Sequence, residues 1–315
     1  MKRLNSITFK QLRALGAVCE FGAISTAAEM LSLTPPAVHS QLRALEENFG
    51  CALVTRTSGG FAPTEAGTAL LAAFRTAQAA LERAVRQIDT LGKGLSGTVV
   101  LGVVSTAKYY APRLVALLGQ EFPDIDVVLR IGNRARIIQM IETGDLDLVI
   151  MGRPPRVPAV VARSIAEHPH LLVAPPGHPL TRLEKVTPDD ILSQRFVMRE
   201  EGSGTRILTM RFLDEIGEGR EFAYTEMESN ETIKQAVAAG LGVAILSGHT
   251  IHEELKSGRL VTIPAQRLPI IRHWFVLHGA NQDLSQPAVR VMDWIVANPD
   301  RFLPGGARVK SENAK

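Results

Sequence analysis

Two helices separated by a three-residue corner are encoded in the stretch Ser25-Thr-Ala-Ala-Glu-Met-Leu31-Ser-Leu-Thr34-Pro-Pro-Ala-Val38-His-Ser-Gln-Leu42-Arg-Ala-Leu45-Glu46. Thr34 can cap the second helix with its hydroxyl, and Pro35 fits the first helical position, where its missing N–H costs nothing. Apolar side chains follow at spacings of four and three along an inward face. They are Val38, Leu42, Leu45 and Phe49. This pattern predicts a helix-turn-helix, whose second helix enters the major groove of DNA.

The outward side of the second helix carries the expected contacts with bases. A helix-turn-helix contacts base edges through the exposed N-terminal half of that helix. The residues expected there are Thr34, Pro35, Pro36, His39, Ser40 and Arg43. Taken alone, the segment is also compatible with an ordinary helical corner inside a core.

The flanking segments supply the remaining parts of such a domain. Thr8 and Gln11 have capping-box spacing and open an earlier, supporting helix. Residues 53–62 contain two short strand-like runs joined by glycines, which predicts a β-hairpin wing. Arg56 on this wing is expected to contact a phosphate and so to add affinity, since base contacts confer specificity. A surface arginine without a partner is the alternative for Arg56.

Composition narrows the class of protein. The chain has 315 residues, of which 45% are hydrophobic, enough for two or three domains. We find no secretory signal and no apolar run of transmembrane length, so we expect a cytoplasmic protein without a membrane contact. Cys19 and Cys51 cannot form a disulfide framework and have no metal-ligating neighbours, so neither a metal nor a cofactor is expected. The net charge of +3 arises within residues 1–97, which suits nucleic acid at that end.

A long amphipathic helix is predicted from Thr64 to about residue 91. Its apolar positions alternate in steps of four and three, as in a coiled-coil seam. The bulky dimerisation residues of this seam are Phe74, Leu81 and Ile88. The alternative is that the stripe packs on the body of the same chain. The glycines within residues 92–97 then predict a flexible hinge.

Beyond the hinge, strand-like and helical segments alternate, which predicts βαβ units with parallel strands. A first set covers residues 98–150 and a second covers residues 171–246, so two α/β lobes are expected. A strand at 274–277 and a helix at 287–296 are expected to return to the first lobe, which makes a hinged clamp with two crossovers. The expected domains are 1–63 for the winged helix-turn-helix, 64–97 for the linker helix and hinge, and 98–315 for the two-lobed region, with lobe I at about 98–162 and 268–300 and lobe II at about 163–267.

The chain resembles the LysR-type transcriptional regulators over nearly its full length. The resemblance rests on Phe9, Leu12, Gly22, Ala27-Ala28, the corner through Leu45-Glu46, Gly50, Arg56, Thr64-Glu-Ala-Gly67 and Gly144-Asp-Leu-Asp-Leu148. It implies a winged DNA-binding domain, a dimerising linker helix, and an effector domain like that of periplasmic binding proteins, commonly in a tetramer. The chain has Pro35, His39 and Ser40 where many members have Gln, Ser and Arg, so the target sequence is not carried over.

Three further segments are similar to the subgroup that controls Calvin-cycle carbon-fixation operons. They are Ser105-Thr-Ala-Lys-Tyr-Tyr-Ala-Pro112, Met151-Gly-Arg-Pro-Pro155 and Glu201-Gly-Ser-Gly-Thr-Arg206. The similarity implies an activator that responds to a phosphorylated metabolite or to reduced nicotinamide nucleotide. The implied partners are a double-stranded DNA operator, a small anionic effector, further copies of the chain in a homodimer or homotetramer, and RNA polymerase. A LysR-type regulator of another pathway, sensing a different small anion, is the alternative.

The residues of the predicted cleft suit an anion. Ser105 and Thr106 follow the first strand of lobe I, and Gly202–Thr205 stands before a helix of lobe II, where backbone N–H groups can face a phosphate. The expected effector contacts are Ser105, Thr106, Lys108, Asn133, Gly202, Ser203, Gly204, Thr205, Arg206 and Asn230. For each polar residue a plain helix cap is the alternative. Arg134 and Arg153 are assigned neither to the cleft nor to solvent.

An enzyme and a transport protein are the other classes considered. The pairs His168/His170 and His249/His252 have no carboxylate or cysteine at metal-ligand spacing. The sequence contains no nucleophile elbow, no P-loop and no clear acid/base pair, so no catalytic residue is expected. A solute-binding protein would share the two lobes but would need export. Both classes are therefore remote alternatives.

Overall fold

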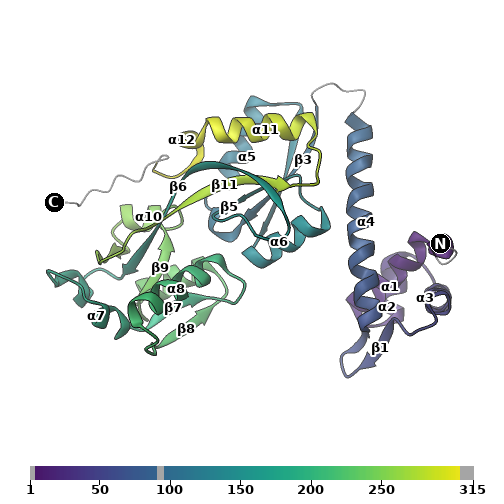
Figure 1. The fold of residues 1–315 in the computed structure, drawn as a ribbon, viewed down its shortest axis with the longest axis horizontal. Helices are drawn as coiled ribbons and strands as arrows, with labels where there is room; N and C mark the ends of the chain where they lie inside the picture. The colour runs from purple at the N-terminus through teal and green to yellow at the C-terminus, as the bar shows by residue number, and fades with distance from the viewer. Residues whose placement is uncertain (1–3, 91–95, 306–315) are drawn as a thin grey trace. The chain divides into compact units, whose positions relative to one another are not determined.

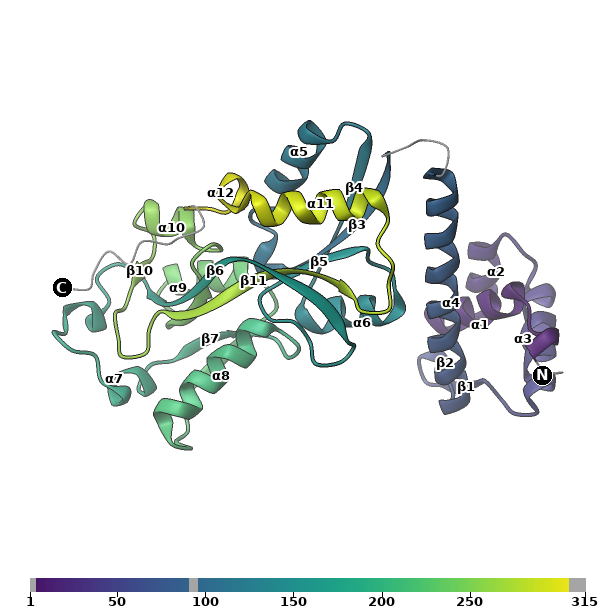
Figure 2. The same ribbon diagram turned by 45° about the horizontal axis from the view of Figure 1, so that its top comes forward.

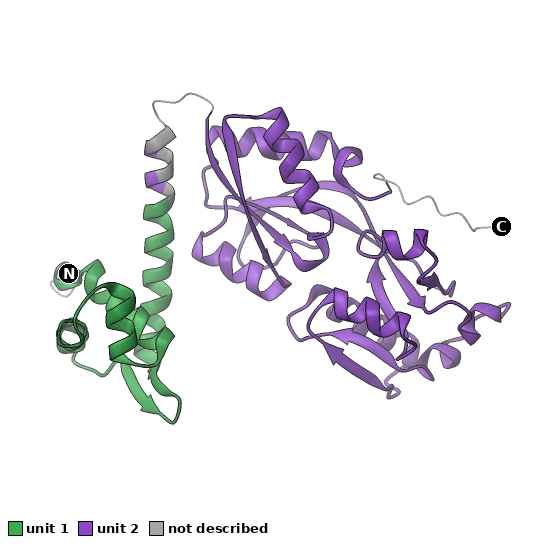
Figure 3. Cartoon of the chain, turned by 180° about the vertical axis from the view of Figure 1, so that it is seen from behind, with its two compact units in different colours: residues 1–83 green, residues 84–315 purple. Residues whose placement is uncertain are grey.

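The protein is described by a computed structural model that covers residues 4–90 and 96–305. The chain forms two compact units, Met1–Arg83 and Ala84–Lys315, which are coloured separately in Figure 3. The division falls inside the long helix α4 (Glu65–Thr90). The bounds of this helix are close to the predicted 64–91. Residues 91–95 of the predicted hinge lie outside the described residues.

The N-terminal unit is the expected winged helix-turn-helix. Its remaining elements are η1 (Leu4–Ser6), α1 (Phe9–Phe21), α2 (Ile24–Leu31), α3 (Pro35–Phe49), β1 (Val54–Thr57) and β2 (Gly60–Pro63). The capping box of α1 is confirmed, because Thr8 Oγ1 accepts from Gln11 N (3.3 Å) and Gln11 Oε1 accepts from Thr8 N (2.8 Å). The antiparallel pair β1–β2 forms the wing. Gly60 meets the end of α1 so closely that an added Cβ would lie 2.3 Å from the carbonyl oxygen of Gly22.

The predicted cap of α3 is wrong in one respect. Thr34 occupies the N-cap position, but its side chain makes no capping hydrogen bond. The two prolines that follow explain the difference. Pro35 and Pro36 carry no N–H, and the N–H of Ala37 donates to the backbone carbonyl of Thr34 instead (3.0 Å). The hydroxyl of Thr34 is therefore left on the exposed surface.

The second unit contains a mixed sheet flanked by helices (Figures 1 and 2). Its strands are β3 (Gly97–Val104), β4 (Ile125–Gly132), β5 (Leu148–Met151), β6 (Val160–Ala174), β7 (Phe196–Arg199), β8 (Tyr224–Met227), β9 (Ala244–Ser247), β10 (Val261–Thr262) and β11 (Ile270–Gly279). Its helices are η2 (Ser105–Ala107), α5 (Ala111–Glu121), α6 (Arg134–Thr143), η3 (Pro179–Arg182), α7 (Pro188–Leu192), α8 (Gly204–Gly217), α9 (Asn230–Ala238), α10 (His252–Lys256), α11 (Gln286–Ala297) and α12 (Pro299–Phe302).

Two long strands connect the halves of this unit. The strand order is β10-β6-β11-β5-β3-β4, with β9 also paired to β6. Strands β3, β4 and β5 are parallel, as predicted, whereas β6 and β11 pair antiparallel to each other and β11 pairs antiparallel to β5. Residues 171–174, where the second expected set begins, are only the end of the fifteen-residue β6. Both crossovers between lobes are therefore continuous strands, which run side by side in Figures 1 and 2.

Separate hydrophobic cores lie on either side of these crossovers. One core draws on β3, β5, α5 and α11 and includes Trp274 of β11. Two further clusters, which include Phe196 and Val197, pack around β7, α8 and α9. We refer to the two halves as lobe I and lobe II. Among the described residues, no helix combines the length and apolar character needed to cross a membrane.

Candidate functional site

The outward face of α3 presents the residues predicted to contact DNA. Thr34, Pro35, Pro36, His39, Ser40 and Arg43 are all exposed. Arg43 forms an ion pair with Glu47 one turn later (2.8 Å), and both side chains are more than 60% exposed, so this pair adds little stability. Arg56 extends from the wing with its guanidinium carbon 5.4 Å from the centroid of the Phe61 ring. The residues predicted to contact bases and the arginine predicted to contact a phosphate are therefore exposed on the same unit.

The three predicted dimerisation residues on helix α4 differ in how far they are buried. Phe74 is only 7% exposed, packs edge-on against Phe9 (5.4 Å between centroids) and belongs to the core of its own unit. Its assignment to a dimer seam is therefore wrong, since its apolar surface is already buried. Leu81 and Ile88 are 52% and 64% exposed, and Val85 between them is 56% exposed. These three residues form an uncovered apolar stripe.

A cavity of about 370 Å³ lies within the second unit, between the two lobes. Of the predicted effector contacts, Ser105, Thr106, Ser203, Gly204 and Thr205 line it. Helix α8 begins here with Ser203 at its N-cap, and this serine makes no side-chain capping bond. Ser203, Thr205 and Thr106 are at least 91% buried. The first turn of α8 thus presents backbone N–H groups and hydroxyls to the cavity.

The other predicted effector contacts lie outside the lining of the cavity. Lys108 lies over the ring of Tyr109, and Gly202 accepts a hydrogen bond from Ala135 N (3.1 Å). Arg206 donates to the carbonyl of Arg199 and to Glu226, both at 2.8 Å. These three residues, together with Asn133 and Asn230, are not among the lining residues. The sequence predicted all five as effector contacts, whereas the structure places them outside this cavity.

Asn133 and Asn230 have structural partners instead. Asn133 caps α6 by accepting from Arg136 N (3.0 Å), as its helix-start position predicted. The cap of α9 is Ser229, and Asn230 is 1% exposed and accepts from Arg199 Nη1 (2.8 Å). The helix-cap alternative therefore holds for Asn133 and shifts by one residue in α9.

Arginines dominate the cavity, and sequence reasoning missed most of them. They are Arg134, Arg153, Arg156, Arg199, Arg211 and Arg272. No aspartate or glutamate is among the lining residues of the described chain. Arg134 and Arg153, left unassigned by the sequence, both belong to the lining. The one available signal was position, because Arg199 ends a strand and Arg211 lies one turn beyond the apolar Ile207 and Leu208 on α8.

Arg199 differs from the other arginines because a carboxylate holds it. Its Nε and Nη2 donate to the two oxygens of Glu200 (2.7 and 2.8 Å), and Nη2 lies 3.4 Å from Ser105 Oγ in lobe I. Glu200 also accepts from Asn133 Nδ2 of lobe I (3.2 Å). Burial raises the pKa of Glu200, but the hydrogen bonds from Arg199 and Asn133 outweigh it and leave that pKa lowered. This ionised group connects the lobes at the edge of the cavity.

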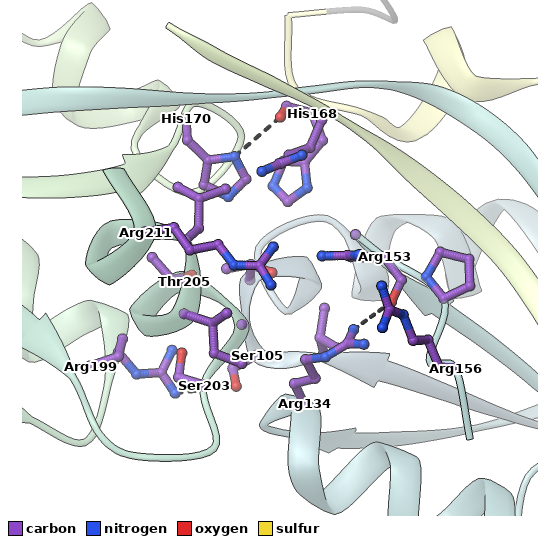
Figure 4. Close-up of a pocket in the computed structure, with 18 residues that line it drawn as sticks. Ser105, Arg134, Arg153, Arg156, His168, His170, Arg199, Ser203, Thr205 and Arg211 are labelled. Carbon is purple, nitrogen blue, oxygen red and sulfur yellow. Dashed lines mark hydrogen bonds between the residues drawn. The ribbon is translucent and has the colours of Figure 1, made fainter. Parts of the chain in front are cut away.

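The remaining ionisable groups of the lining are arginines and two histidines, and they differ in protonation. Burial, and then the nearby charge of Arg153, lower the pKa of Arg134, whose guanidinium donates to the carbonyl of Arg153 (Figure 4). His168 and His170 are buried, and burial lowers the pKa of His170 to about 4 and that of His168 well below its ordinary value. Both imidazoles are therefore neutral at pH 7, and the arginines alone give the cavity its positive potential.

Two family models match the chain. The bacterial regulatory helix-turn-helix family of the lysR type matches residues 9–68, and the LysR substrate binding domain matches residues 92–299. The chain belongs to the LysR family of transcriptional regulators, which are DNA-binding proteins and not enzymes. The resemblance and the fold class inferred from the sequence are thus confirmed.

Individual proteins that are similar to this chain include regulators of carbon-fixation genes and solved structures of the same fold. The chain is 48% identical to the HTH-type transcriptional regulator CbbR of Cereibacter sphaeroides over 307 residues, which covers 97% of this chain and 99% of the relative. It is 36% identical to the RuBisCO operon transcriptional regulator of Allochromatium vinosum, covering 94% and 98%. The CcmR regulatory domain of Synechocystis in complex with 2-PG is similar with a TM-score of 0.59 and 30% identity, over 64% of this chain and 96% of that domain. Full-length CbnR in complex with target DNA shares the fold, with a TM-score of 0.68 and 17% identity over 92% and 99%.

Proposed function

We propose that this chain regulates transcription of a carbon-fixation operon in response to a small phosphorylated metabolite that binds in the cavity between lobes I and II. The relatives named for CbbR and the RuBisCO operon support the pathway. The CcmR domain, whose structure contains 2-PG, supports the kind of effector. In this proposal the metabolite alters closure of the lobes, and lobe closure alters how the DNA-binding units engage the operator.

The cavity carries the proposal through its electrostatics. A phosphate at the first turn of α8 receives backbone N–H groups at the positive end of the helix, and Ser203 and Thr205 add hydroxyl donors. Ser105 and Thr106 approach from lobe I. Because carboxylates are absent from the described lining, a cation or a neutral apolar ligand would gain nothing from these donors. An anionic metabolite is the ligand that satisfies them.

The DNA-binding side of the proposal follows the exposed residues of the first unit. His39, Ser40 and Arg43, with Thr34, Pro35 and Pro36 at the start of α3, contact base edges, and Arg56 contacts a phosphate. The stripe of Leu81, Val85 and Ile88 joins two chains, so that two half-sites are bound together. A homodimer or homotetramer that activates transcription through RNA polymerase in the cytoplasm completes the proposal.

Isothermal titration calorimetry combined with DNase footprinting tests the effector site. We expect Thr205→Val to weaken binding of a phosphorylated metabolite by about 1 to 3 kcal/mol, because a hydrogen bond to a charged group is lost. Operator affinity without the metabolite should not change. Thr209→Val on the same helix is the matched control, since Thr209 is buried, does not line the cavity, and donates to the carbonyl of Thr205 (3.0 Å).

Unchanged metabolite affinity in Thr205→Val would place the effector elsewhere. A metabolite that binds without altering the footprint would remove the proposed coupling between cavity and DNA. A panel of phosphorylated metabolites and plain carboxylates separates the proposal from its main alternative. If only unphosphorylated anions bind and shift the footprint, the chain serves another pathway.

A further inference from the structure

The cavity has two walls that can bind an anion, and they come from different lobes. Figure 4 shows Ser203 and Thr205 of lobe II on one side and Arg153 and Arg156 of lobe I on the other. Arg134 lies with the lobe I group, where its guanidinium donates to the carbonyl of Arg153. The lobe II wall is the first turn of α8, whereas the lobe I wall is made of side-chain charges on α6 and on the segment after β5.

The lobe I wall is not neutralised by the protein. Among the described residues, no ion pair joins a carboxylate to Arg134, Arg153 or Arg156. Arg199, by contrast, is held by Glu200. Like charges that lie together repel each other, and an anion placed between them removes that repulsion. The first turn of α8 does not meet this need, because it belongs to the opposite wall.

The volume of the cavity agrees with a ligand that reaches both walls. About 370 Å³ is within the range of pockets that enclose small organic ligands, and it exceeds the space that one inorganic anion fills. Neutral groups also line the cavity, among them Val104, Pro154 and Leu208, which suit a short carbon skeleton. A phosphate bound to α8 would therefore leave the lobe I wall without a counter-charge.

The geometry points to an effector with two anionic ends. Its phosphate occupies the first turn of α8 in lobe II, and a second carboxylate or phosphate binds Arg153 and Arg156, supported by Arg134, in lobe I. This inference rests on the proposed function and specifies the ligand of the same site. Since each end binds a different lobe, only one arrangement of the lobes engages both ends. A two-ended ligand thereby gains the differential affinity that a conformational response requires.

Ethyl phosphate and phosphoglycolate are a matched pair of probes, because both have two carbons and differ in a methyl group against a carboxylate. We expect calorimetry on the full chain to show phosphoglycolate binding at least about tenfold more tightly, as a charge-assisted hydrogen bond to arginine provides. The double variant Arg153→Gln/Arg156→Gln should remove this preference, because it weakens phosphoglycolate about tenfold more than ethyl phosphate, which has no second anion to lose. Thr205→Val should weaken both probes, because it acts on the shared phosphate.

Arg130→Gln is the control for net charge, since Arg130 is an exposed arginine of β4 that does not line the cavity. Denaturant unfolding followed by tryptophan fluorescence verifies that each variant is folded. A preference below about threefold in the unchanged chain, or one that survives in Arg153→Gln/Arg156→Gln, overturns the inference. If the preference for phosphoglycolate is lost in Arg211→Gln instead, the inference is also overturned, because the second anion then binds lobe II. If neither probe nor any other phosphate compound binds, the proposed function fails as well, whereas equal binding of both probes refutes only the two-ended effector.

Discussion

Three buried histidines form a cluster with Trp274, and two of them, His168 and His170, line the cavity. The ring of His168 stacks on that indole at 3.8 Å and its Nε2 lies 2.9 Å from Ser247 Oγ, while Trp274 Nε1 donates to His249 Nδ1 (3.1 Å). His170 packs against His168 with 4.2 Å between ring centroids. Burial lowers the pKa of His170 and of His249 to about 4. The folded chain therefore keeps these rings neutral where an unfolded chain would protonate them.

This difference in protonation predicts an acid-sensitive second unit. Between pH 6.5 and 4 the unfolded chain binds more protons than the folded chain, so the free energy of unfolding falls as the pH is lowered. From pH 7 to pH 5 we expect a loss of about 2 kcal/mol for each of His170 and His249. Both tryptophans, Trp274 and Trp294, lie in the second unit, so their fluorescence during denaturant unfolding follows it.

His170→Asn tests the assignment of this pH dependence, because it removes one titrating ring. The variant should lose about 2 kcal/mol less than the unchanged chain between pH 7 and pH 5. His273→Asn, on β11 outside the cavity lining, is the matched control. An identical pH dependence in His170→Asn and the unchanged chain would show that His170 is not held neutral by the fold.

The second prediction at this scale concerns DNA. His39→Ala or Ser40→Ala should weaken specific operator binding by about 1 to 3 kcal/mol and leave binding to random DNA nearly intact, since base contacts carry discrimination. Arg56→Ala should weaken both kinds of binding. Fluorescence anisotropy with operator and scrambled duplexes measures the two. An equal loss of His39→Ala on both duplexes would mean that His39 does not contact a base.

At the scale of the element, α4 serves two purposes along its length. Its N-terminal half completes the core of the DNA-binding unit through Leu71 and Phe74, and its later turns carry the exposed stripe of Leu81, Val85 and Ile88. The heptad-like spacing is continuous across both halves. Periodicity alone therefore predicted one seam, whereas contacts with α1 divide it into two surfaces.

Leu81→Asp and Phe74→Ala should separate these two roles. Leu81→Asp places a charge in the stripe and should release monomers, with weaker operator binding because the half-sites are no longer bound together. Phe74→Ala should instead destabilise the first unit by about 3 to 5 kcal/mol through a cavity in its core. Light scattering and circular dichroism distinguish the outcomes. A folded Leu81→Asp variant with unchanged molar mass would place the interface elsewhere.

At the scale of the whole second unit, β6 and β11 connect the lobes, and a cluster of polar groups joins the lobes by hydrogen bonds at the edge of the cavity. Glu200 of lobe II contacts Asn133 of lobe I, and Gly202 accepts from Ala135 N across the same boundary. Arg199, only 3% exposed, depends on Glu200 for its counter-charge. The arrangement of the lobes and the ionisation of Glu200 are therefore linked through the Arg199–Glu200 pair.

Glu200→Ala should lower the free energy of unfolding of the second unit by about 3 to 5 kcal/mol, because it leaves the buried guanidinium of Arg199 without a partner. The double variant Arg199→Met/Glu200→Leu should recover much of that loss, since no charge then remains buried. Denaturant unfolding followed by tryptophan fluorescence measures both variants. If the double variant is as unstable as Glu200→Ala, the pair is not the source of the effect.

Much of the fold and part of the site were predictable from local patterns. The capping box at Thr8 and the cap at Asn133 depend on side chains within a few residues of one another, and the structure contains both of them. The hydroxyls of Ser105 and Thr205 were placed at strand and helix ends and do line the cavity. Lys108 and Arg206 were not distinguishable from them by position alone, since Lys108 lies over the ring of the adjacent Tyr109 and Arg206 donates to Glu226 of β8.

The sequence by itself determined the class of protein, the helix-turn-helix with its wing, the long linker helix and the alternating elements of the second unit. These features depend on hydrophobic periodicity and on capping residues, which act over one or two turns of chain. Only the tertiary structure decided that Phe74 is core, that β6 and β11 are the crossovers, and that the arginines of α6, α8, β7, β11 and the segment after β5 meet in one cavity. The register of β11 against β6 sets Arg272 opposite His168, and the other arginines come from elements that meet only through packing between residues far apart in the chain.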